Sequence, residues 1–254
     1  MKRIQATHYI FLILGMLITN ACSTNKDKPN AQQIVDQALA AHGAQNLDKA
    51  VVTFNLRDKH YRVLRDEGAF VYSRTFKDDS TGQRMHDVLS NSGFKRTADD
   101  AEVELPEKKI TAYTSSVNSV VYFALLPQSL NDAAVQKTYL GETTIKGEPY
   151  YKVKVTFAQD GGGEDFEDVF VYWFHQNNHT MDYFAYSFQE EDGEGTRFRE
   201  AVNPREISGI RFQDYINYTS KEKFPLENYD KAFEAGKLEK VSEINLEDVK
   251  VSKL

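Results

Sequence analysis

Cysteine is almost absent from this sequence: its 254 residues include one, Cys22, beside one tryptophan and six prolines. A single cysteine excludes a disulfide within the chain, so a packed core has to stabilise the fold. Basic residues are fewer than acidic ones, 31 against 38, and the formal net charge is −7 at pH 7. This acidic balance argues against nucleic acid as a partner, since proteins bind nucleic acids through basic surfaces.

A long apolar run is missing as well. Residues 10–18, IFLILGMLI, are apolar apart from a glycine, but crossing a bilayer takes roughly 20 such residues. Lys2 and Arg3 precede this run, and the small residue Ala21 follows it. A basic start, a short apolar stretch and a small residue are typical of secretion signals, so we expect residues 1–21 to form a signal peptide.

Cys22 comes directly after this segment, in the sequence TNAC. The arrangement resembles the lipobox of bacterial lipoproteins, in which the cysteine becomes the acylated N-terminus after cleavage. The resemblance implies a chain anchored through Cys22 in the bacterial cell envelope, and we expect the outer membrane. The polar residues 22–33 then form a tether and residues 34–254 a single domain. The alternative is an ordinary secretion signal followed by an incidental cysteine.

The periodicity of apolar residues predicts an α+β fold that is mostly β. Residues 31–43 carry apolar side chains at helical spacing and end in Gly43, a residue type that commonly follows a helix. Period-two alternation then dominates, most clearly at residues 150–157, and polar turn sequences such as KDDSTGQ separate the alternating segments. Short strands joined by tight turns are typical of a long antiparallel meander.

Residues 115–135 break this pattern, because they are apolar on nearly every side as far as Pro127. Proline disfavours the continuation of a helix, so we expect one helix, at residues 117–126, and a short second helix after Pro127. A helix that is apolar on most sides is buried, and this one is therefore expected to pack against the sheet.

Two aromatic strands are expected at residues 169–174 and 181–188, where both alternating faces are apolar. An antiparallel strand with one face in water would alternate apolar and polar side chains, so both faces of these strands must be covered. The helix at residues 117–126 can cover one face. The cover of the other face is more protein or an apolar ligand, and a plain two-sided core is the simpler interpretation.

His175 and His179 lie four positions apart, a spacing that suggests zinc when both residues are on a helix. The sequence QNNH between two strand-like segments predicts a hairpin loop instead, so the histidines flank a turn. The sequence offers no third ligand at a recognised spacing, and we expect no metal there. It also lacks nucleotide-binding loops and the G-x-S-x-G elbow, and we expect no cofactor.

Arg197 and Arg199 share one face of a predicted strand, with Asp182 and Asp214 on neighbouring strands. A cross-strand ion pair explains the two arginines, and so does an anion clamp for a head group or carboxylate. Both are included among the candidate ligand-binding residues, which are Val121, Phe123, Leu126, Trp173, Tyr183, Tyr186, Arg197 and Arg199.

The segment LGETTIKGEPYYKVKVTF, residues 140–157, resembles the paired strands of the LolA/LolB-like family of bacterial lipoprotein carriers. The segments YWFHQNNHTMDYFAYSF and GTRFREAVNPREISGIRFQDYINY are similar to outer-membrane lipoproteins of unknown function from Bacteroidetes-type bacteria. The family resemblance implies a long curved antiparallel sheet, an unclosed barrel, with helices packed on its concave side. It also implies a membrane-anchored lipoprotein that binds a lipid or another apolar ligand in a half-barrel cavity.

Two other functions stay open. One is an anchored envelope enzyme of the hydrolase type, with His175, Asp182 and Arg197 as candidate catalytic groups. The other is a scaffold or partner-binding module with a filled core. An apolar cavity lined by aromatic residues would favour ligand binding, and a wet cleft at His175 would favour catalysis.

The lipoprotein prediction can be tested at Cys22. Because acyl chains on this residue would hold the chain at the membrane, Cys22→Ala should move the protein from the membrane fraction to the soluble fraction of its host. Immunoblotting of the two fractions measures the shift. A variant that stays in the membrane fraction would contradict anchoring through Cys22.

Overall fold

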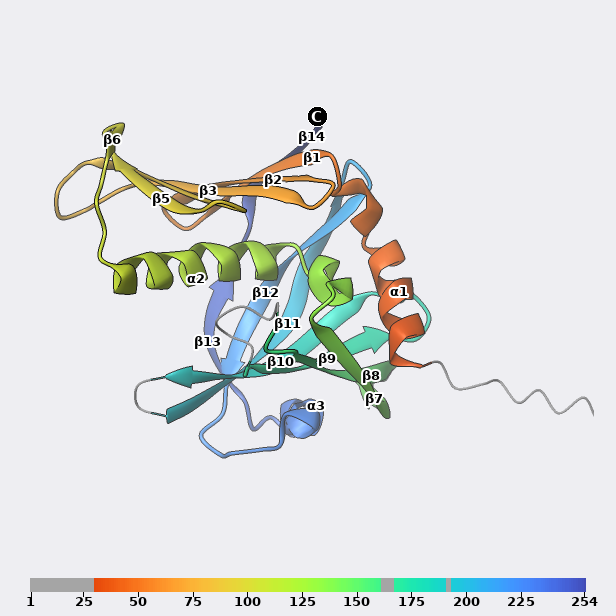
Figure 1. Ribbon diagram of the computed structural model, residues 1–254. Coiled ribbons are helices and arrows are strands. Elements are labelled where there is room, and N and C mark those ends of the chain that lie inside the picture. Colours follow the sequence, from red (N-terminus) through yellow and green to blue (C-terminus); the bar gives the residue numbers. More distant parts are fainter. Residues whose placement is uncertain (1–29, 161–166, 191–192) are drawn as a thin grey trace, which may run out of the picture.

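The computed structural model describes residues 30–160, 167–190 and 193–254, and the expected signal peptide and Cys22 lie outside these ranges. Its strands form two antiparallel sheets of seven strands each (Figure 1). The first sheet contains, in hydrogen-bonded order, β14 (Glu247–Lys253), β1 (Ala50–Leu56), β2 (Lys59–Asp66), β3 (Ala69–Lys77), β4 (Arg84–Ser90), β5 (Gly93–Ala98) and β6 (Ala101–Glu102).

The second sheet follows the same kind of order, with sequential strands as neighbours. It contains β13 (Glu239–Ile244), β12 (Ile210–Thr219), β11 (Gly193–Ile207), β10 (Met181–Glu190), β9 (Val169–His175), β8 (Glu148–Phe157) and β7 (Val135–Ile145). The helices are α1 (Ala31–Ala41), α2 (Glu107–Ala124) and α3 (Tyr229–Glu234), with 3-10 turns η1 (Ala44–Asn46), η2 (Gln128–Asn131) and η3 (Leu226–Asn228).

The predicted fold class is confirmed: the chain is mostly β, its strands pair antiparallel, and the sheets are not closed into a barrel. The expected long sheet is divided into two. β13 and β14 lie at the edges of different sheets, and residues 245–246 carry the chain from one sheet to the other.

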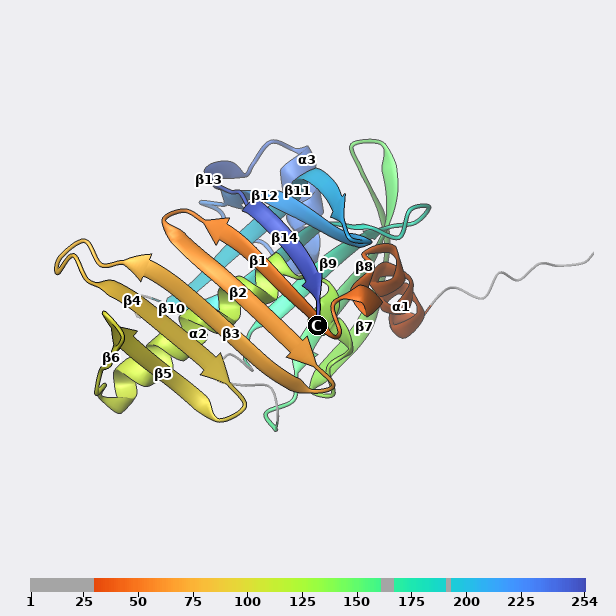
Figure 2. The ribbon, with the colours of Figure 1, turned by 90° about the horizontal axis from the view of Figure 1, so that it is seen from above.

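α2 lies between the two sheets, below the first sheet in Figure 1 and behind it in Figure 2. Val117 and Val121 are buried in the core of the first sheet, whereas Phe123 packs on the aromatic core of the second. The helix begins at Glu107, well before the expected residue 117. Its first turns are polar, so apolar periodicity does not reveal them.

A buried charged cluster fixes the middle of α2 on the first sheet. Arg74, Asp87 and Arg96 lie directly opposite one another on β3, β4 and β5. Asp87 accepts hydrogen bonds at 2.6 Å from Nη2 of Arg74 and from Nε of Arg96. Nη1 of Arg74 also donates to Oγ of Ser116 at 2.8 Å, and the Arg96 guanidinium lies 3.6 Å from the ring centroid of Tyr113. We call Arg74, Asp87 and Arg96 the Asp87 cluster.

Protein also covers the opposite face of the second sheet. There α3 and the residues flanking it pack on a separate core, as Figure 1 shows below the sheet. Trp173 is fully buried in this core, with its ring 5.6 Å from that of Phe198, and Tyr229 of α3 is fully buried beside them. The prediction that both faces of the aromatic strands are covered is confirmed. Periodicity does not reveal the six-residue helix that covers this face.

A break in pairing shifts one residue of β10 to an unexpected face. Strict alternation would place Met181 beside Tyr183. The register of β9 and β10 shifts between these two residues, so that Met181 pairs with Phe174 and Tyr183 with Trp173. Met181 therefore lies in the core that faces α2 and Tyr183 in the core under α3, because a bulge resets which residues share a face.

The edge strand β7 has an irregular register too. Its exposure alternates along eleven residues, and its pairing with β8 shifts between Tyr139 and Gly141. Gly141 has a φ of 107°, a conformation that favours glycine.

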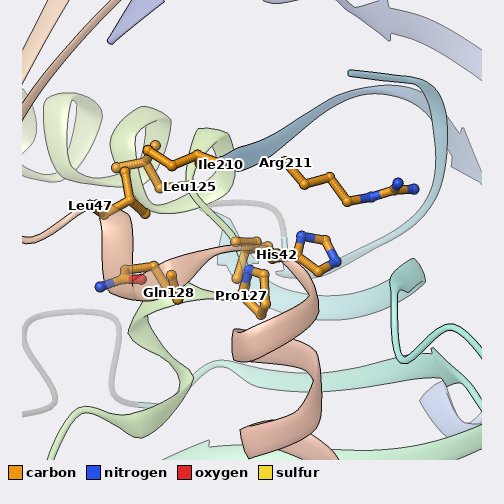
Figure 3. Close-up of a pocket in the computed structure, with 9 residues that line it drawn as sticks. His42, Leu47, Leu125, Pro127, Gln128, Ile210 and Arg211 are labelled. Atoms are coloured by element: carbon orange, nitrogen blue, oxygen red, sulfur yellow. The ribbon is translucent and has the colours of Figure 1, made fainter. Parts of the chain in front are cut away.

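The end of α1 packs closely on the turn between β11 and β12. A Cβ on Gly43, whose φ is 69°, would come within 1.8 Å of the Gly209 carbonyl oxygen, so this contact requires glycine. His42 beside it is buried, and its Nε2 accepts the Met181 backbone N–H at 3.0 Å. Figure 3 shows the His42 ring next to Pro127 in a small cavity of about 10 Å³. Burial, and secondly the nearby Arg211, lower the pKa of His42 to about 3.

Trp173→Ala should lower the free energy of unfolding by about 3–5 kcal/mol, because it opens a void in a fully buried core. Trp173→Phe, which keeps most of the ring volume, should cost less. Urea unfolding followed by far-ultraviolet circular dichroism measures both changes. A loss below about 1 kcal/mol for the alanine variant would show that this core is not tightly packed.

His42 should make stability depend on pH. Because its folded-state pKa lies below the ordinary 6.5, the unfolded chain binds a proton between pH 6.5 and about 3 that the folded chain does not. The contribution of the buried, neutral His42 to the free energy of unfolding is therefore fully present above pH 6.5. It is lost as the pH falls from 6.5 towards 3, by at most about 1.4 kcal/mol per pH unit. His42→Gln keeps an acceptor for the Met181 backbone N–H and cannot titrate. As the pH is lowered from 6.5, the urea midpoint of this variant should therefore fall less steeply than that of the unmodified protein. Equal slopes for both proteins would contradict the assignment.

Candidate ligand-binding site

A cavity of about 340 Å³ lies where α2, the second sheet and the connection between β13 and β14 meet. Its lining is mostly apolar and aromatic, with a few hydroxyl groups and two guanidinium groups. The lining residues are Leu56, Arg57, Ser119, Val120, Phe123, Ala124, Tyr186, Arg199, Tyr215, Ile244 and Leu246. Pockets that bind small molecules have volumes of about 300–1,000 Å³, so this cavity falls at the lower end of that range.

Stacked aromatic rings form one wall of the cavity. Phe123 projects from α2 onto the second sheet, where its ring centroid lies 5.2 Å from that of Tyr186 and 5.8 Å from that of Phe184. The Tyr186 ring stacks in turn on Phe170 at 5.3 Å. Tyr186 and Phe184 share a face of β10 because they are two residues apart, so alternation along the strand builds this wall.

Arg199 reaches into the aromatic wall from β11. Its side chain is 8 % exposed, and its guanidinium carbon lies 4.1 Å from the ring centroid of Phe123 and 5.2 Å from that of Tyr186. Nη2 donates to the Tyr186 hydroxyl at 2.9 Å. Burial lowers the pKa of Arg199, because it penalises the charged form.

Tyr215 contributes a second phenol from β12. Its hydroxyl oxygen accepts a hydrogen bond from Nε2 of Gln213 at 3.0 Å. Burial raises the pKa of Tyr215 to about 12, so the phenol is neutral at pH 7 and its own proton is available to an acceptor.

The structure brings together only some of the residues predicted to bind a ligand. Phe123, Tyr186 and Arg199 line the cavity. Val121 and Leu126 are buried, the first in the core of the first sheet and the second in the core where α1 meets the second sheet.

The remaining three candidates lie elsewhere. Trp173 and Tyr183 face the core under α3, on the opposite side of the second sheet from the cavity. Arg197 is half-buried, with its guanidinium carbon 5.2 Å from the Phe188 ring centroid. The shared face of Arg197 and Arg199 is confirmed by their pairing with Tyr186 and Phe184.

The candidate catalytic groups do not converge. His175 ends β9, where its Nδ1 accepts the backbone N–H groups of the hairpin and its Nε2 lies 3.3 Å from Oε2 of Glu148. Asp182 accepts a hydrogen bond from the Tyr150 hydroxyl at 3.1 Å. Arg197 pairs with Tyr186, four residues from Asp182 or roughly 13 Å along the strand.

The predicted hairpin between the two histidines is confirmed, with β9 ending at His175 and β10 beginning at Met181. Within the described ranges, no three His, Cys, Asp or Glu side chains come close enough together to hold a metal ion. None of the helices in those ranges is both long and apolar enough to span a membrane.

Sequence reasoning missed the cavity residues that come from remote segments. Leu56 ends β1 and Arg57 follows it, and Ile244 ends β13 while Leu246 lies in the connection between the sheets. Nothing in local periodicity places the end of one sheet beside the edge of the other. The burial of Arg199 among aromatic rings has no local sequence signal, because Arg197 shares its face of β11 and only tertiary packing distinguishes the two arginines.

Two solved structures are similar to this chain in fold. A LolA superfamily protein from Nitrosomonas europaea has 13 % sequence identity and a TM-score of 0.49, over 89 % of this chain and 96 % of that one. A DUF1329 family protein from Desulfovibrio piger has 11 % identity and a TM-score of 0.49, over 88 % of this chain and 93 % of that one. Both are likenesses of fold, of the LolA-like kind that the sequence segments also resemble.

No curated protein matches the chain in sequence. A family model described as "Family of unknown function (DUF6503)" matches residues 8–246, which is most of the chain. The chain therefore belongs to the family DUF6503.

Proposed function

We propose that this protein is a membrane-anchored lipoprotein that binds a lipid or another apolar ligand in the cavity between α2 and the second sheet. The observation that carries the proposal is the cavity itself, about 340 Å³ in volume and lined by Val120, Phe123, Tyr186, Ile244 and Leu246 among others. Apolar side chains that leave such a volume between them give an apolar ligand a surface to replace water.

The arrangement of α2 supports the same proposal. Protein cores are normally packed with few voids larger than a water molecule. Here the helix is in contact with both sheets, yet the space beside its C-terminal half remains open. A scaffold with a filled core would not need this space, and an enzyme would need catalytic groups around it. His175, Asp182 and Arg197 are absent from its lining.

Anchoring completes the proposal. The single domain, whose first helix begins at Ala31, would be held to acyl chains on Cys22 by the polar residues that precede that helix, in the bacterial cell envelope and at the outer membrane. The side chain that would carry the lipid lies outside the described residues, and the fractionation of Cys22→Ala tests this part independently.

Filling the cavity should block binding. The uncharged probe N-phenyl-1-naphthylamine brightens in apolar surroundings, and we expect purified protein to bind it saturably. Ser119 lines the cavity, so Ser119→Trp should place a large ring in it and weaken probe binding about 10-fold or more. Fluorescence titration gives the dissociation constants.

Asn118→Trp provides the matched control, because Asn118 is the neighbouring residue on α2 and its side chain is exposed. It should bind the probe like the unmodified protein. Two results would show that the cavity is not a site for apolar ligands. One is that the unmodified protein does not increase the fluorescence of the probe, and the other is that the two tryptophan variants weaken its binding equally.

A further inference from the structure

The polar groups of the cavity have one chemical character. They are the guanidinium groups of Arg57 and Arg199 and the hydroxyl groups of Ser119, Tyr186 and Tyr215. Among the described residues, no carboxylate contributes to the lining. Each of these polar groups can donate a hydrogen bond, and two of them are cationic, in a chain whose net charge is −7.

Arg199 is incompletely paired. A guanidinium has five N–H donors, and the described partners of Arg199 account for one hydrogen bond, from Nη2 to the Tyr186 hydroxyl. Its Nε is enclosed and has no hydrogen-bond partner among the described residues.

The other buried arginines of the described residues, those of the Asp87 cluster, do have a counter-charge. Arg74 and Arg96 are as buried as Arg199, and both donate to the carboxylate of Asp87. Within the described ranges, no acidic side chain forms a salt bridge with Arg199. Aromatic rings at 4.1 to 5.4 Å attract its charge, but they offer no acceptor for the unused N–H groups.

Burying a cation without an anion is unfavourable, because the charge loses its hydration and gains no counter-charge. Such a group is expected where a ligand supplies the missing charge. Arg57 is exposed at the end of β1 and adds a second positive charge to the wall, which attracts the same kind of ligand.

We propose that the ligand of this cavity is an amphiphile with one hydrocarbon chain and one anionic group, a carboxylate or a phosphate ester, which Arg199 binds. The inference rests on the proposed function, since it names the class of ligand for that cavity. The anionic oxygens accept from the guanidinium and from the phenol of Tyr215, and the chain packs against Val120, Phe123 and Ile244. The volume of about 340 Å³ suits one chain better than the two chains of a phospholipid.

Dodecyl compounds that differ only in the head group test this directly. Dodecanoate, dodecyl phosphate and uncharged dodecanol would displace N-phenyl-1-naphthylamine from the purified full chain, below their micelle-forming concentrations. The two anions should bind about 10- to 100-fold more tightly than dodecanol, as expected for a charge-assisted hydrogen bond. Their relative affinities distinguish a carboxylate from a phosphate ester, and inorganic phosphate, which has no chain, should displace no probe at millimolar concentration.

Two variants assign the preference to a residue. Arg199→Met keeps an unbranched side chain of about the length of the arginine's aliphatic stem and removes the charged guanidinium, so anions and dodecanol should bind it equally. Arg197→Met is the matched control, since Arg197 is the next arginine on the same face of β11 and lies outside the lining. It should keep the full preference for anions.

The outcomes separate this inference from the function on which it rests. Equal affinities for dodecanol and dodecanoate in the unmodified protein would overturn the inference and leave apolar binding intact, and this comparison needs no variant to fold. A preference that survives in Arg199→Met would also overturn it. Displacement by inorganic phosphate alone would identify a free anion as the ligand, and absence of binding by all three dodecyl compounds would overturn the proposed function as well.

Discussion

The enclosure of α2 between two sheets is the constraint on which the rest of the structure depends. A helix in this position contacts a different surface on each of two sides, so its two sides must match those surfaces separately. On one side the Asp87 cluster and Val117 fix it to the first sheet, and on the other Phe123 packs on aromatic rings of the second. These contacts set the distance between the two sheets. The cavity is the part of the space between them that side chains do not fill.

The sequence predicts much of this arrangement, because apolar periodicity reports directly on burial. It predicts the antiparallel strands, a helix before Pro127 that packs on the sheet and the two covered faces of β9 and β10, and all of these are confirmed. Alternation assigns a residue to a face of a strand but does not say what covers that face. The sequence therefore could not show that Trp173 lies in a filled core and Tyr186 beside the cavity. The bulge beside Met181 and the passage of the chain between sheets at residues 245–246 depend on tertiary contacts that no local pattern encodes.

The aromatic residues of the second sheet lie on its two faces and have different structural roles. Those under α3 are enclosed by protein and contribute to stability, as Trp173 and Phe198 illustrate. Of those facing α2, Tyr186 and Tyr215 border the cavity together with Phe123 of the helix. The buried arginines differ in a similar way, because Arg74 and Arg96 of the first sheet pair with the carboxylate of Asp87, whereas Arg199 of the second sheet lies among aromatic rings. Substitutions on the two faces of one strand therefore act on different properties of the protein.

The irregular edge strand β7 bears on self-association. A strand at the end of a sheet offers its free N–H and C=O groups to a strand of another molecule, and a flat edge would let two copies join into one continuous sheet. The register shift between Tyr139 and Gly141 bends β7 along its length, and the charged Glu142 follows the bend. A partner strand could then pair along only part of the edge before the two backbones diverge. The β7 edge therefore offers a second copy of this chain a short pairing segment in place of a continuous one.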